Sequence, residues 1–284
     1  MKERISGTTK IVGLLGWPVE HSFSPAMHNA VFEYLDMDYA YIPFPVPPTG
    51  LARAVRGLFQ AGVKGVNVTV PHKVRVMDCL DEIDPYAQAV GAVNTVTLHQ
   101  GRLQGYNTDG AGFIASLAEA GFNPTGKRFL LLGAGGAARA AAFALVGAGA
   151  DKVFIANRTF NRAEALAGAL PPNIGAAAGF FRDDLTKVID ACHCLVNTTS
   201  VGMYPHAGAL PIPAELIKSH LIVADLVYNP VETELLIEAR ARGCRTVSGL
   251  GMLIYQGAAS FKIWTGREAP VELMLQVLKK ENRQ

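Results

Sequence analysis

Lys73 and Asp109 are the two side chains of this sequence whose types and positions most directly suggest chemistry. Lys73 follows Pro71 after a β-branched alternating run, and a helix that began at Pro71 would hold the lysine in its first turn. The positive end of the helix dipole opposes an ammonium there and favours loss of its proton. Asp109 follows Thr108, a predicted helix N-cap, where a carboxylate is stabilised as an anion. The two form a proton-handling pair if the fold brings them together.

Length and composition indicate a globular chain of two domains. The sequence has 284 residues, of which 50% are hydrophobic, and one domain takes roughly 150 residues. Its 26 basic and 24 acidic residues give a formal net charge of +2 without long charged runs. Neither a nucleic-acid groove nor a polybasic membrane patch is therefore predicted. We expect a small-molecule substrate, with no nucleic acid and no membrane as partner.

The cysteines indicate a reducing compartment. The sequence contains four of them: Cys79, Cys192, Cys194 and Cys244. Their spacing fits neither a zinc site nor a disulfide-stapled secreted domain, so we expect free thiols in a cytoplasmic protein. Residues 189–196 are predicted to form a buried strand in which Cys192 and Cys194 share one face and His193 takes the other. No metal site is expected there.

Residues 128–146 have the pattern of a dinucleotide-binding strand, turn and helix. The apolar run 128–132 predicts a strand and the alanine-rich run 139–146 a helix. The turn between them is the predicted pyrophosphate site: Gly133, Ala134, Gly135, Gly136 and Ala137. Gly133 permits the turn, Gly135 allows close approach of the backbone, and the helix N-terminus supplies amide donors.

The end of the next predicted strand, 152–156, favours NADP over NAD. An NAD-specific protein would often place an acidic residue at this point for the ribose diol. This sequence instead has Asn157, Arg158 and Thr159, followed by Arg162. Two arginines and two neutral hydrogen-bonding side chains suit a 2′-phosphate. For Arg162 alone, a solvated helix position is nearly as good an interpretation.

Alternating strands and helices predict two α/β units. In the first part we expect strands near 11–15, 39–44, 64–69, 93–98 and 102–106, and helices near 25–35, 49–60, 72–79 and 109–120. In the second part we expect strands ending at 196 and covering 221–226 and 244–247, with a helix at 232–242. The segment after Ser248 is predicted to be helical and to return to the first unit.

Two serines and a glutamine are further candidates for ligand binding. Ser24 precedes Pro25, so a helix N-cap explains it at least as well as ligand contact does. Ser22 has no such role, and in an extended chain both hydroxyls face the same side and suit a carboxylate. Gln256 lies on an otherwise apolar helical face and needs a partner there, which a structural hydrogen bond would also provide.

Seven short motifs, in order along the chain, match one known family. They are Ser-Phe-Ser-Pro (22–25), Asn-Val-Thr-Val-Pro-His-Lys (67–73), Gly-Ala-Val-Asn-Thr (91–95), Asn-Thr-Asp-Gly (107–110), Gly-Ala-Gly-Gly-Ala (133–137), Asn-Arg-Thr (157–159) and Gly-Leu-Gly-Met (249–252). On these motifs the chain closely resembles the shikimate dehydrogenase family. The glycine turn and the Asn-Arg-Thr segment also resemble glutamyl-tRNA reductases, an assignment that the N-terminal motifs exclude.

The resemblance implies a reaction and a fold. The reaction is the reversible reduction of 3-dehydroshikimate to shikimate by NADPH, a step toward chorismate and the aromatic amino acids. The fold is α/β with two domains and a catalytic cleft between them. Residues 1–108 and 249–284 would form the substrate-binding and catalytic domain, and residues 109–248 the Rossmann-like NADP-binding domain.

The resemblance also implies roles for individual residues. Ser22 and Ser24 would bind the substrate carboxylate. The ring hydroxyls would be held by Thr69, Lys73, Asn94 and Asp109, and the pocket would be completed by Gln256. Tyr228 and Gly249 correspond to positions near the nicotinamide; Tyr228 belongs to the expected substrate site, and Gly249 and Met252 to the expected cofactor site. Thr69 and Asn94 are also types that end strands or cap turns, and Tyr228 also suits a half-buried core position.

We expect Lys73 to be the general acid in reduction and the base in oxidation, with Asp109 orienting it and the substrate. Tyr106 departs mildly from the family pattern, in which a small or polar residue is common. A quinate/shikimate dehydrogenase of the same fold is the alternative enzyme, and a ligand sensor without catalysis is the alternative outside enzymes. The oligomeric state does not follow from the sequence, and a homodimer is kept open beside the monomer.

Overall fold

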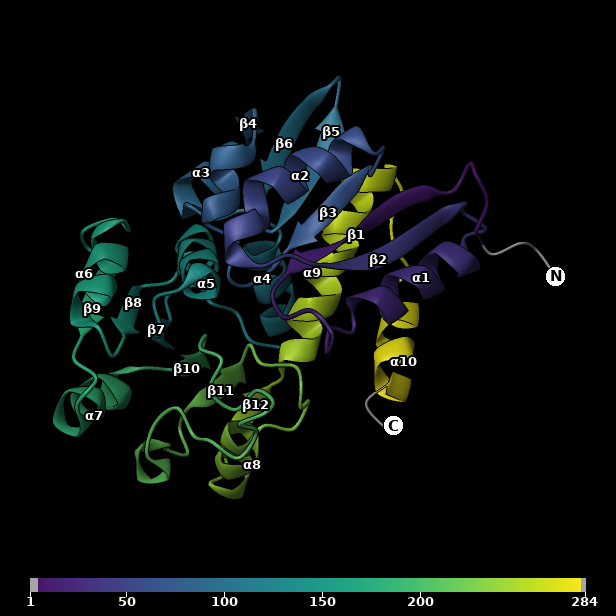
Figure 1. Cartoon of the computed structure of the whole chain (residues 1–284). Helices are drawn as coiled ribbons and strands as arrows, with labels where there is room; N and C mark the ends of the chain where they lie inside the picture. Colours follow the sequence, from purple (N-terminus) through teal and green to yellow (C-terminus); the bar gives the residue numbers. More distant parts are fainter. Residues whose placement is uncertain (1–4, 282–284) are drawn as a thin grey trace. The chain divides into compact units, whose positions relative to one another are not determined.

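The computed structural model describes residues 5–281 and has a mixed α/β fold (Figure 1). The polypeptide divides into two compact units, each with its own six-stranded sheet. Unit 1 comprises Met1–Thr108 and Gln256–Gln284, and unit 2 comprises Asp109–Tyr255. The α/β class predicted from the sequence is confirmed. The second boundary lies inside helix α9 (Gly249–Thr265), which begins where the returning segment is predicted.

The sheet of unit 1 has the strand order β2-β1-β3-β5-β6-β4. Its strands are β1 (Lys10–Gly16), β2 (Tyr39–Pro45), β3 (Gly65–Val68), β4 (Glu82–Ile83), β5 (Thr95–His99) and β6 (Arg102–Tyr106). Strand β1 pairs in parallel with β2 and β3, whereas β5 runs antiparallel to both β3 and β6. The helices of the unit, besides α9, are α1 (Ser24–Tyr34), α2 (Leu51–Gln60), α3 (Pro85–Val90) and α10 (Val271–Glu281).

Side-chain alternation along β3 separates an apolar face from a polar one. Val66 and Val68 belong to the hydrophobic core that includes the apolar residues of α2. On the opposite face, the backbone of Gly65 lies directly against the ring of Trp264, and Asn67 bonds to Ser260, both from α9. Because successive strand residues point to opposite faces, β3 carries a core on one side and polar groups on the other.

His28 of α1 is fully buried in an aromatic cluster of unit 1. Its ring stacks on Tyr41 with centroids 4.5 Å apart, and Phe32, Phe261 and Trp264 lie around it. Neither ring nitrogen has a hydrogen-bond partner among the described residues. Burial lowers the pKa of the imidazole from 6.5 to about 3, so His28 is neutral in the folded protein.

This burial predicts a loss of stability in mild acid. The unfolded chain binds a proton at His28 near pH 6.5, whereas the folded chain does so only near pH 3. The contribution of His28 to stability is therefore complete above its unfolded pKa and falls by about 1.4 kcal/mol for each pH unit below it. Urea unfolding at several pH values between about 7 and 5 should show a shallower dependence on pH for His28→Phe than for the unaltered protein. Equal slopes would contradict this account.

The sheet of unit 2 has the order β12-β11-β10-β7-β8-β9, and all its strand pairs are parallel. Its strands are β7 (Arg128–Leu132), β8 (Lys152–Ala156), β9 (Gly175–Ala178), β10 (Cys194–Asn197), β11 (Ile222–Asp225) and β12 (Arg245–Val247). Its helices, before α9, are α4 (Asp109–Glu119), α5 (Gly136–Gly147), α6 (Phe160–Gly168), α7 (Arg182–Ala191) and α8 (Glu234–Ala241). The strand order reverses between β7 and β10, as in a doubly wound sheet, and ligands bind at the carboxyl ends of strands at such a point.

Helices cover both faces of this sheet. Phe129 and Leu131 of β7 pack with apolar residues of α4, α5 and α6. Leu130 and Leu132, one residue out of phase, pack with those of α7 and α8. A strand buried on both faces is a continuous apolar run, which is why residues 128–132 and 152–156 could be assigned as strands from the sequence.

Two segments have a different type of secondary structure from the one predicted. Residues 72–79 do not form an α-helix, because only Arg75–Cys79 are helical, as the 3₁₀ helix η2. Residues 189–191 belong to the end of α7, and the strand begins only at Cys194.

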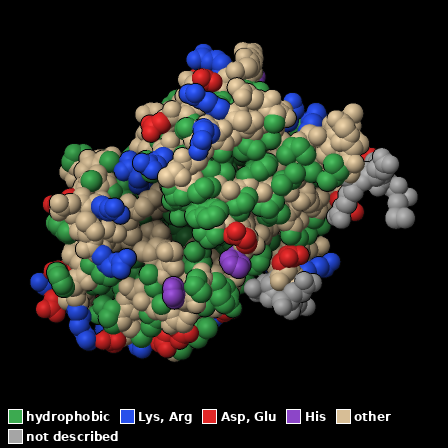
Figure 2. All heavy atoms as spheres, in the orientation of Figure 1, with side chains coloured by type: hydrophobic (Ala, Val, Ile, Leu, Met, Phe, Trp, Pro, Cys, Tyr) green, Lys and Arg blue, Asp and Glu red, His purple; other side chains and the backbone are tan. Residues whose placement is uncertain are grey.

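Within residues 5–281, none of the helices combines the length and the hydropathy that a membrane span requires. On the face drawn in Figure 2, the Lys and Arg side chains of the described residues are spread among acidic and uncharged ones.

Candidate active site

Six polar residues of unit 1 gather on the α9 side of the sheet, and we call them the buried polar cluster. They are Asn67, Asn94, Thr95, Thr108, Gln256 and Ser260. None is more than 8% exposed. Buried polar side chains of this kind need hydrogen-bond partners, and a fully bonded set holds each member in one orientation.

Asn94 is the most highly connected residue of this cluster. Its Nδ2 donates to Gln256 Oε1 at 3.3 Å and to Thr108 Oγ1 at 2.9 Å, and its Oδ1 accepts from the backbone N–H of Thr108 at 2.8 Å. Its backbone is also bonded on both sides, to Val68 and to Tyr106. Two residues predicted to bind substrate, Asn94 and Gln256, are thus brought together although they lie far apart in the sequence.

Ser260 is a member of the cluster that sequence reasoning missed. It lies one helical turn beyond Gln256 and is fully buried. Its hydroxyl lies 2.9 Å from Asn67 Nδ2, 2.8 Å from Thr95 Oγ1 and 3.0 Å from the carbonyl oxygen of Gln256. The only signal in the sequence is a second polar residue on the helical face of Gln256, because residues four apart share a face.

Lys73 is half-buried in a turn between β3 and η2. The expected first turn of an α-helix at Pro71 is therefore wrong, and so is the dipole argument that depended on it. The carbonyl oxygen of Lys73 accepts from the N–H of Val93 at 2.8 Å, and so it is engaged by the chain leading to Asn94. His72 fixes the turn by bonding through Nε2 to the carbonyl oxygen of Val46 at 2.7 Å. Tertiary hydrogen bonds, rather than a helix, position this lysine.

Ser22, Ser24 and Thr69 lie in segments that follow strands β1 and β3. Helix α1 begins at Ser24, so the expected N-cap role of this serine is wrong, and the cap position is Phe23. Ser22 Oγ accepts from the backbone N–H of Ser24 at 3.2 Å, which holds the two serines close together. Thr69 is half-buried, and its N–H donates to the carbonyl oxygen of Leu15 at 2.9 Å. Their contacts with a substrate remain predictions.

Asp109 is the first residue of α4 and only 3% exposed. This is the position expected from the sequence, where the helix N-terminus stabilises an anion. The hydroxyl of the preceding Thr108 bonds within the buried polar cluster, to Asn94 and Ser260. The chain passes from unit 1 to unit 2 between these two residues.

The glycine turn of unit 2 has the shape that a pyrophosphate needs. Gly133 has a φ of +112°, and a Cβ at this position would lie 2.7 Å from Thr198 Oγ1, so only glycine fits. A Cβ at Gly135 would meet no described atom within 4 Å, which leaves room beside the backbone. Helix α5 begins at Gly136, earlier than predicted, so its free N–H groups belong to the turn itself. These residues fit the expected dinucleotide.

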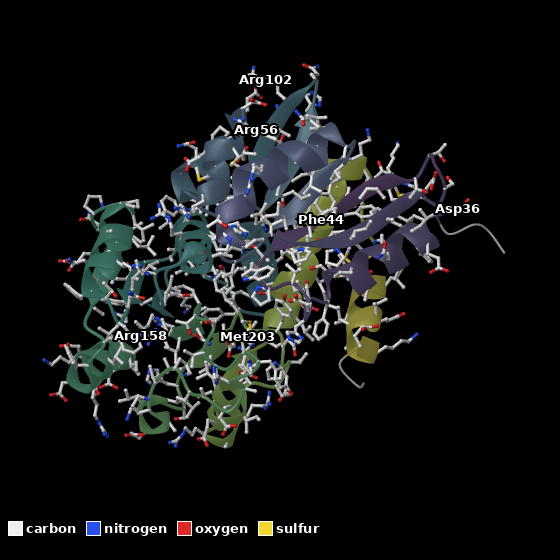
Figure 3. The ribbon with its side chains drawn as sticks, viewed as in Figure 1. Asp36, Phe44, Arg56, Arg102, Arg158 and Met203 are labelled. Carbon is white, nitrogen blue, oxygen red and sulfur yellow. The ribbon has the colours of Figure 1, made fainter. Side chains whose placement is uncertain are left out.

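A cavity of about 490 Å³ lies at the ends of β8 and β9. Its lining includes Asn157 and Arg158 from the end of β8 and Phe160, Phe181 and Asp184 from the starts of α6 and α7. Arg158 lies between these two helices (Figure 3). A guanidinium at such an opening suits the 2′-phosphate of NADP.

The remaining predicted site residues of unit 2 are not among those that line this cavity. Thr159 and Arg162 are exposed and lie outside the residues that line the cavity. Tyr228 is half-buried after β11, and Gly249 is buried at the start of α9. Met252 packs into the core shared with α4 and α5. Phe160, Phe181 and Asp184 were missed, because nothing in their local sequence marks them as neighbours of Arg158.

Family models match the chain in three consecutive segments. The model for the shikimate dehydrogenase substrate binding domain matches residues 14–96. The model for shikimate / quinate 5-dehydrogenase matches residues 116–204. The model for the shikimate 5′-dehydrogenase C-terminal domain matches residues 249–279. The first segment contains Ser22, Lys73 and Asn94, and the second contains the glycine turn.

Similar proteins extend over nearly the whole chain. The curated shikimate dehydrogenase (NADP(+)) of Methanopyrus kandleri is 50% identical over 275 residues, which are 95% of each chain. A shikimate dehydrogenase solved in complex with NADP⁺ is 42% identical with a TM-score of 0.92, covering 99% of this chain and 98% of that one. The Thermus thermophilus shikimate 5-dehydrogenase solved with NADP(H) and shikimate is 39% identical with a TM-score of 0.86, covering 96% of this chain and 99% of that one.

Proposed function

Because this chain belongs to the shikimate dehydrogenase family, we propose that it catalyses the reversible reduction of 3-dehydroshikimate to shikimate by NADPH. This reaction is a step toward chorismate and the aromatic amino acids. The observation that carries the proposal is the identity of 50% across 95% of both this chain and an NADP-dependent relative. The geometry of the buried polar cluster and of the glycine turn also supports the proposal.

Unit 1 supplies the groups that would hold the substrate. Shikimate is a ring with one carboxylate and several hydroxyls. Ser22 and Ser24, held together by their own hydrogen bond, suit the carboxylate. Asn94 and Gln256 present amide groups whose orientation is set by the cluster, and we assign each to a ring hydroxyl. Such a bond at Asn94 would replace one of those that its Nδ2 makes to Thr108 and Gln256. Thr69 and Lys73 are assigned to the remaining hydroxyls.

Lys73 is assigned the proton transfer. In the direction of reduction, NADPH supplies a hydride when bound, and the substrate ketone becomes an alkoxide that needs a proton. The Lys73 ammonium donates this proton, and in oxidation the Lys73 amine takes it back. Asp109, at the start of α4, would orient the lysine and accept a hydrogen bond from the substrate hydroxyl. Both roles are proposals for these residues.

Ser260 supplies a test of the buried polar cluster. Ser260→Ala removes a hydroxyl that bonds to Asn67, Thr95 and the turn carrying Gln256. The KM for shikimate should rise by about threefold to tenfold while the KM for NADP⁺ stays the same. Steady-state kinetics of oxidation will measure both.

Thr265→Val is the matched control for this change. Thr265 lies on the same helix, and its hydroxyl donates to the carbonyl oxygen of Phe261 in that helix instead of to the cluster. The control should lower stability slightly and leave both KM values unchanged. An equal rise in the KM for shikimate in both variants would contradict a specific role for Ser260.

Quinate is the substrate that an alternative function would use, since one matching family model covers shikimate and quinate enzymes together. Quinate carries a further tertiary hydroxyl beside its carboxylate, so it would need more room near Ser22 and Ser24. Arg158 at the end of β8 favours NADP, and with it the shikimate assignment.

Location and assembly are further parts of the proposal. We place the activity in the cytoplasm because all four cysteines are free thiols, which are the usual state in a reducing compartment. A homodimer is proposed as the assembly to test against the monomer by sedimentation.

Growth of a bacterial strain tests the pathway. A strain lacking its own shikimate dehydrogenase requires added aromatic amino acids. Expression of this chain should remove the requirement, and expression of the Lys73→Ala variant should not. Failure of the well-expressed, folded protein to restore growth would contradict the proposed function.

A further inference from the structure

Asp225 is a buried carboxylate that the proposed mechanism does not use. It ends β11 and is 1% exposed. Burial raises the pKa of this carboxyl to about 6, and hydrogen bonds from Thr233, Val227 and Asn197 oppose the rise. Its hydrogen-bond partners in the described part of the chain are neutral groups. Burying a carboxylate among neutral groups is costly, so its place in the fold calls for an explanation.

The contacts of Asp225 join three separate segments of unit 2. Oδ2 accepts from Thr233 Oγ1 at 2.7 Å, at the start of α8. Oδ1 accepts from the backbone N–H of Val227 at 3.0 Å and from Asn197 Nδ2 at 2.9 Å. A neutral side chain of the same size, asparagine, would keep the Oδ1 acceptor for Asn197 and Val227 and lose only the acceptor for Thr233.

Asn197 carries the connection onward toward the glycine turn. It is fully buried, and its Oδ1 accepts from Thr199 Oγ1 at 2.7 Å while its Nδ2 also donates to the carbonyl oxygen of Val201 at 3.0 Å. Thr198, between these residues, donates to the carbonyl oxygen of Leu132 at 2.6 Å. The loop after β10 is thus held against the residue that precedes Gly133.

Val227 links Asp225 to the start of α9. A Cβ at Gly249 would lie 2.5 Å from the carbonyl oxygen of Val227, so the loop after β11 lies directly against the start of α9. Tyr228, a predicted site residue, is the next residue of this loop. One carboxylate therefore connects the wall of the glycine turn to the segments that carry Tyr228 and Gly249.

The strand order indicates which part of a dinucleotide would lie over these loops. Arg158 and its cavity lie after β8 and β9, on one side of β7, whereas β10 and β11 lie on the other. If the 2′-phosphate binds at Arg158 and the pyrophosphate at the turn after β7, the nicotinamide half would extend over the ends of β10 and β11. The loops joined by Asp225 are those that this half must meet.

We propose that Asp225 is a positioning residue for the nicotinamide half of NADP, acting through the loops after β10 and β11. The inference rests on the proposed NADP dependence. Because Asp225 is only 1% exposed, it would act without touching the cofactor, through the fixed shape of the surface that receives the reacting ring. Under this proposal, only binding of the nicotinamide half depends on Asp225. The adenosine half would bind at Arg158, outside the loops that Asp225 joins.

The test compares the whole cofactor with its adenosine half. For Asp225→Ala, kcat/KM for NADP⁺ should fall at least about tenfold, while the Kd of adenosine 2′,5′-bisphosphate measured by calorimetry should change less than about twofold. Asp225→Asn keeps the size and the Oδ1 acceptor for Asn197 and Val227, and it should stay within about threefold of the unaltered protein.

Two further variants keep the test decisive. Ile189→Ala removes a buried side chain elsewhere in unit 2 and should lower the melting temperature without changing either cofactor value. If Asp225→Ala does not fold, Thr199→Val takes its place. This variant removes the hydrogen bond from Thr199 Oγ1 to Asn197 and keeps the methyl group beside Gly133. It should lower kcat/KM for NADP⁺ about threefold.

Three results would overturn the proposal: unchanged kcat/KM in the folded Asp225→Ala or Thr199→Val variant, equal losses for NADP⁺ and the bisphosphate, or a tenfold loss in Asp225→Asn. Measurements on the unaltered protein distinguish these results from a failure of the proposed function. If it neither binds the bisphosphate nor oxidises shikimate with NADP⁺, the NADP dependence itself is wrong.

Discussion

Replacing Lys73 with alanine is expected to lower kcat for shikimate oxidation by about 10²- to 10⁴-fold, the range that general acid and base groups contribute. The hydroxyl proton of shikimate must leave as the hydride leaves, and the variant has no amine to accept it. The KM for shikimate should rise far less, since Ser22, Asn94 and Gln256 remain. Initial rates at saturating NADP⁺ will separate the two constants.

Lys73→Arg is the matched control for this prediction. An arginine keeps the positive charge and donates hydrogen bonds, but it does not give up its proton near neutral pH. We expect kcat to stay low in this variant even if substrate affinity is largely kept. A kcat that survives in Lys73→Ala, with only KM increased, would reduce the lysine to a binding residue.

Replacing Arg158 with alanine is expected to change cofactor preference by about 10- to 100-fold. Arg158 lines the cavity at the ends of β8 and β9, where we propose that the 2′-phosphate binds. The variant should lose kcat/KM for NADP⁺ and keep it for NAD⁺, because NAD⁺ has no phosphate at this position. Parallel titrations of both cofactors at fixed shikimate will measure the ratio.

Arg182→Ala controls for the removal of a positive charge from the same unit. Arg182 is exposed and pairs with Glu215 at 3.0 Å, so its loss should leave both cofactors unaffected. Arg162→Ala shows whether the second predicted arginine shares the phosphate. If Arg158→Ala weakened NAD⁺ and NADP⁺ equally, the 2′-phosphate would have to lie elsewhere.

The first two strands of unit 2 and the turn between them could be predicted from the sequence in detail. Strands 128–132 and 152–156 are confirmed to the residue, because strands buried on both faces are continuous apolar runs with clear ends. The tight turn at Gly133 is confirmed as well, since a positive φ beside a close neighbour leaves glycine as the residue that fits. These features are local, and local sequence carries them.

The turn that carries Lys73 could not be predicted in the same way. Pro71 after a strand is a good local signal for a helix start. The chain instead follows hydrogen bonds to distant segments, from the His72 ring to Val46 and from the N–H of Val93 to the Lys73 carbonyl. Tertiary contacts outweighed local preference, so the structural reason given for Lys73 is wrong, and its catalytic role stays a prediction.

The contacts of Ser260 and Asp225 could not be predicted from the sequence either. Ser260 bonds to Asn67 and Thr95, which are separated from it by more than half of the chain. Asp225 is marked in the sequence only as an acidic residue at the end of an apolar run. Their partners follow from the strand order of each sheet, which a single sequence does not display.

The most direct test of the proposed function is the initial rate of near-ultraviolet absorbance gain when the purified protein oxidises shikimate or quinate with NADP⁺ or NAD⁺, in all four pairings. We predict that shikimate with NADP⁺ gives by far the highest kcat/KM. Comparable turnover of quinate, or a preference for NAD⁺, would assign the protein to the quinate alternative. Binding of shikimate and NADP⁺ without turnover in any pairing would contradict the assignment as an enzyme and favour a ligand sensor.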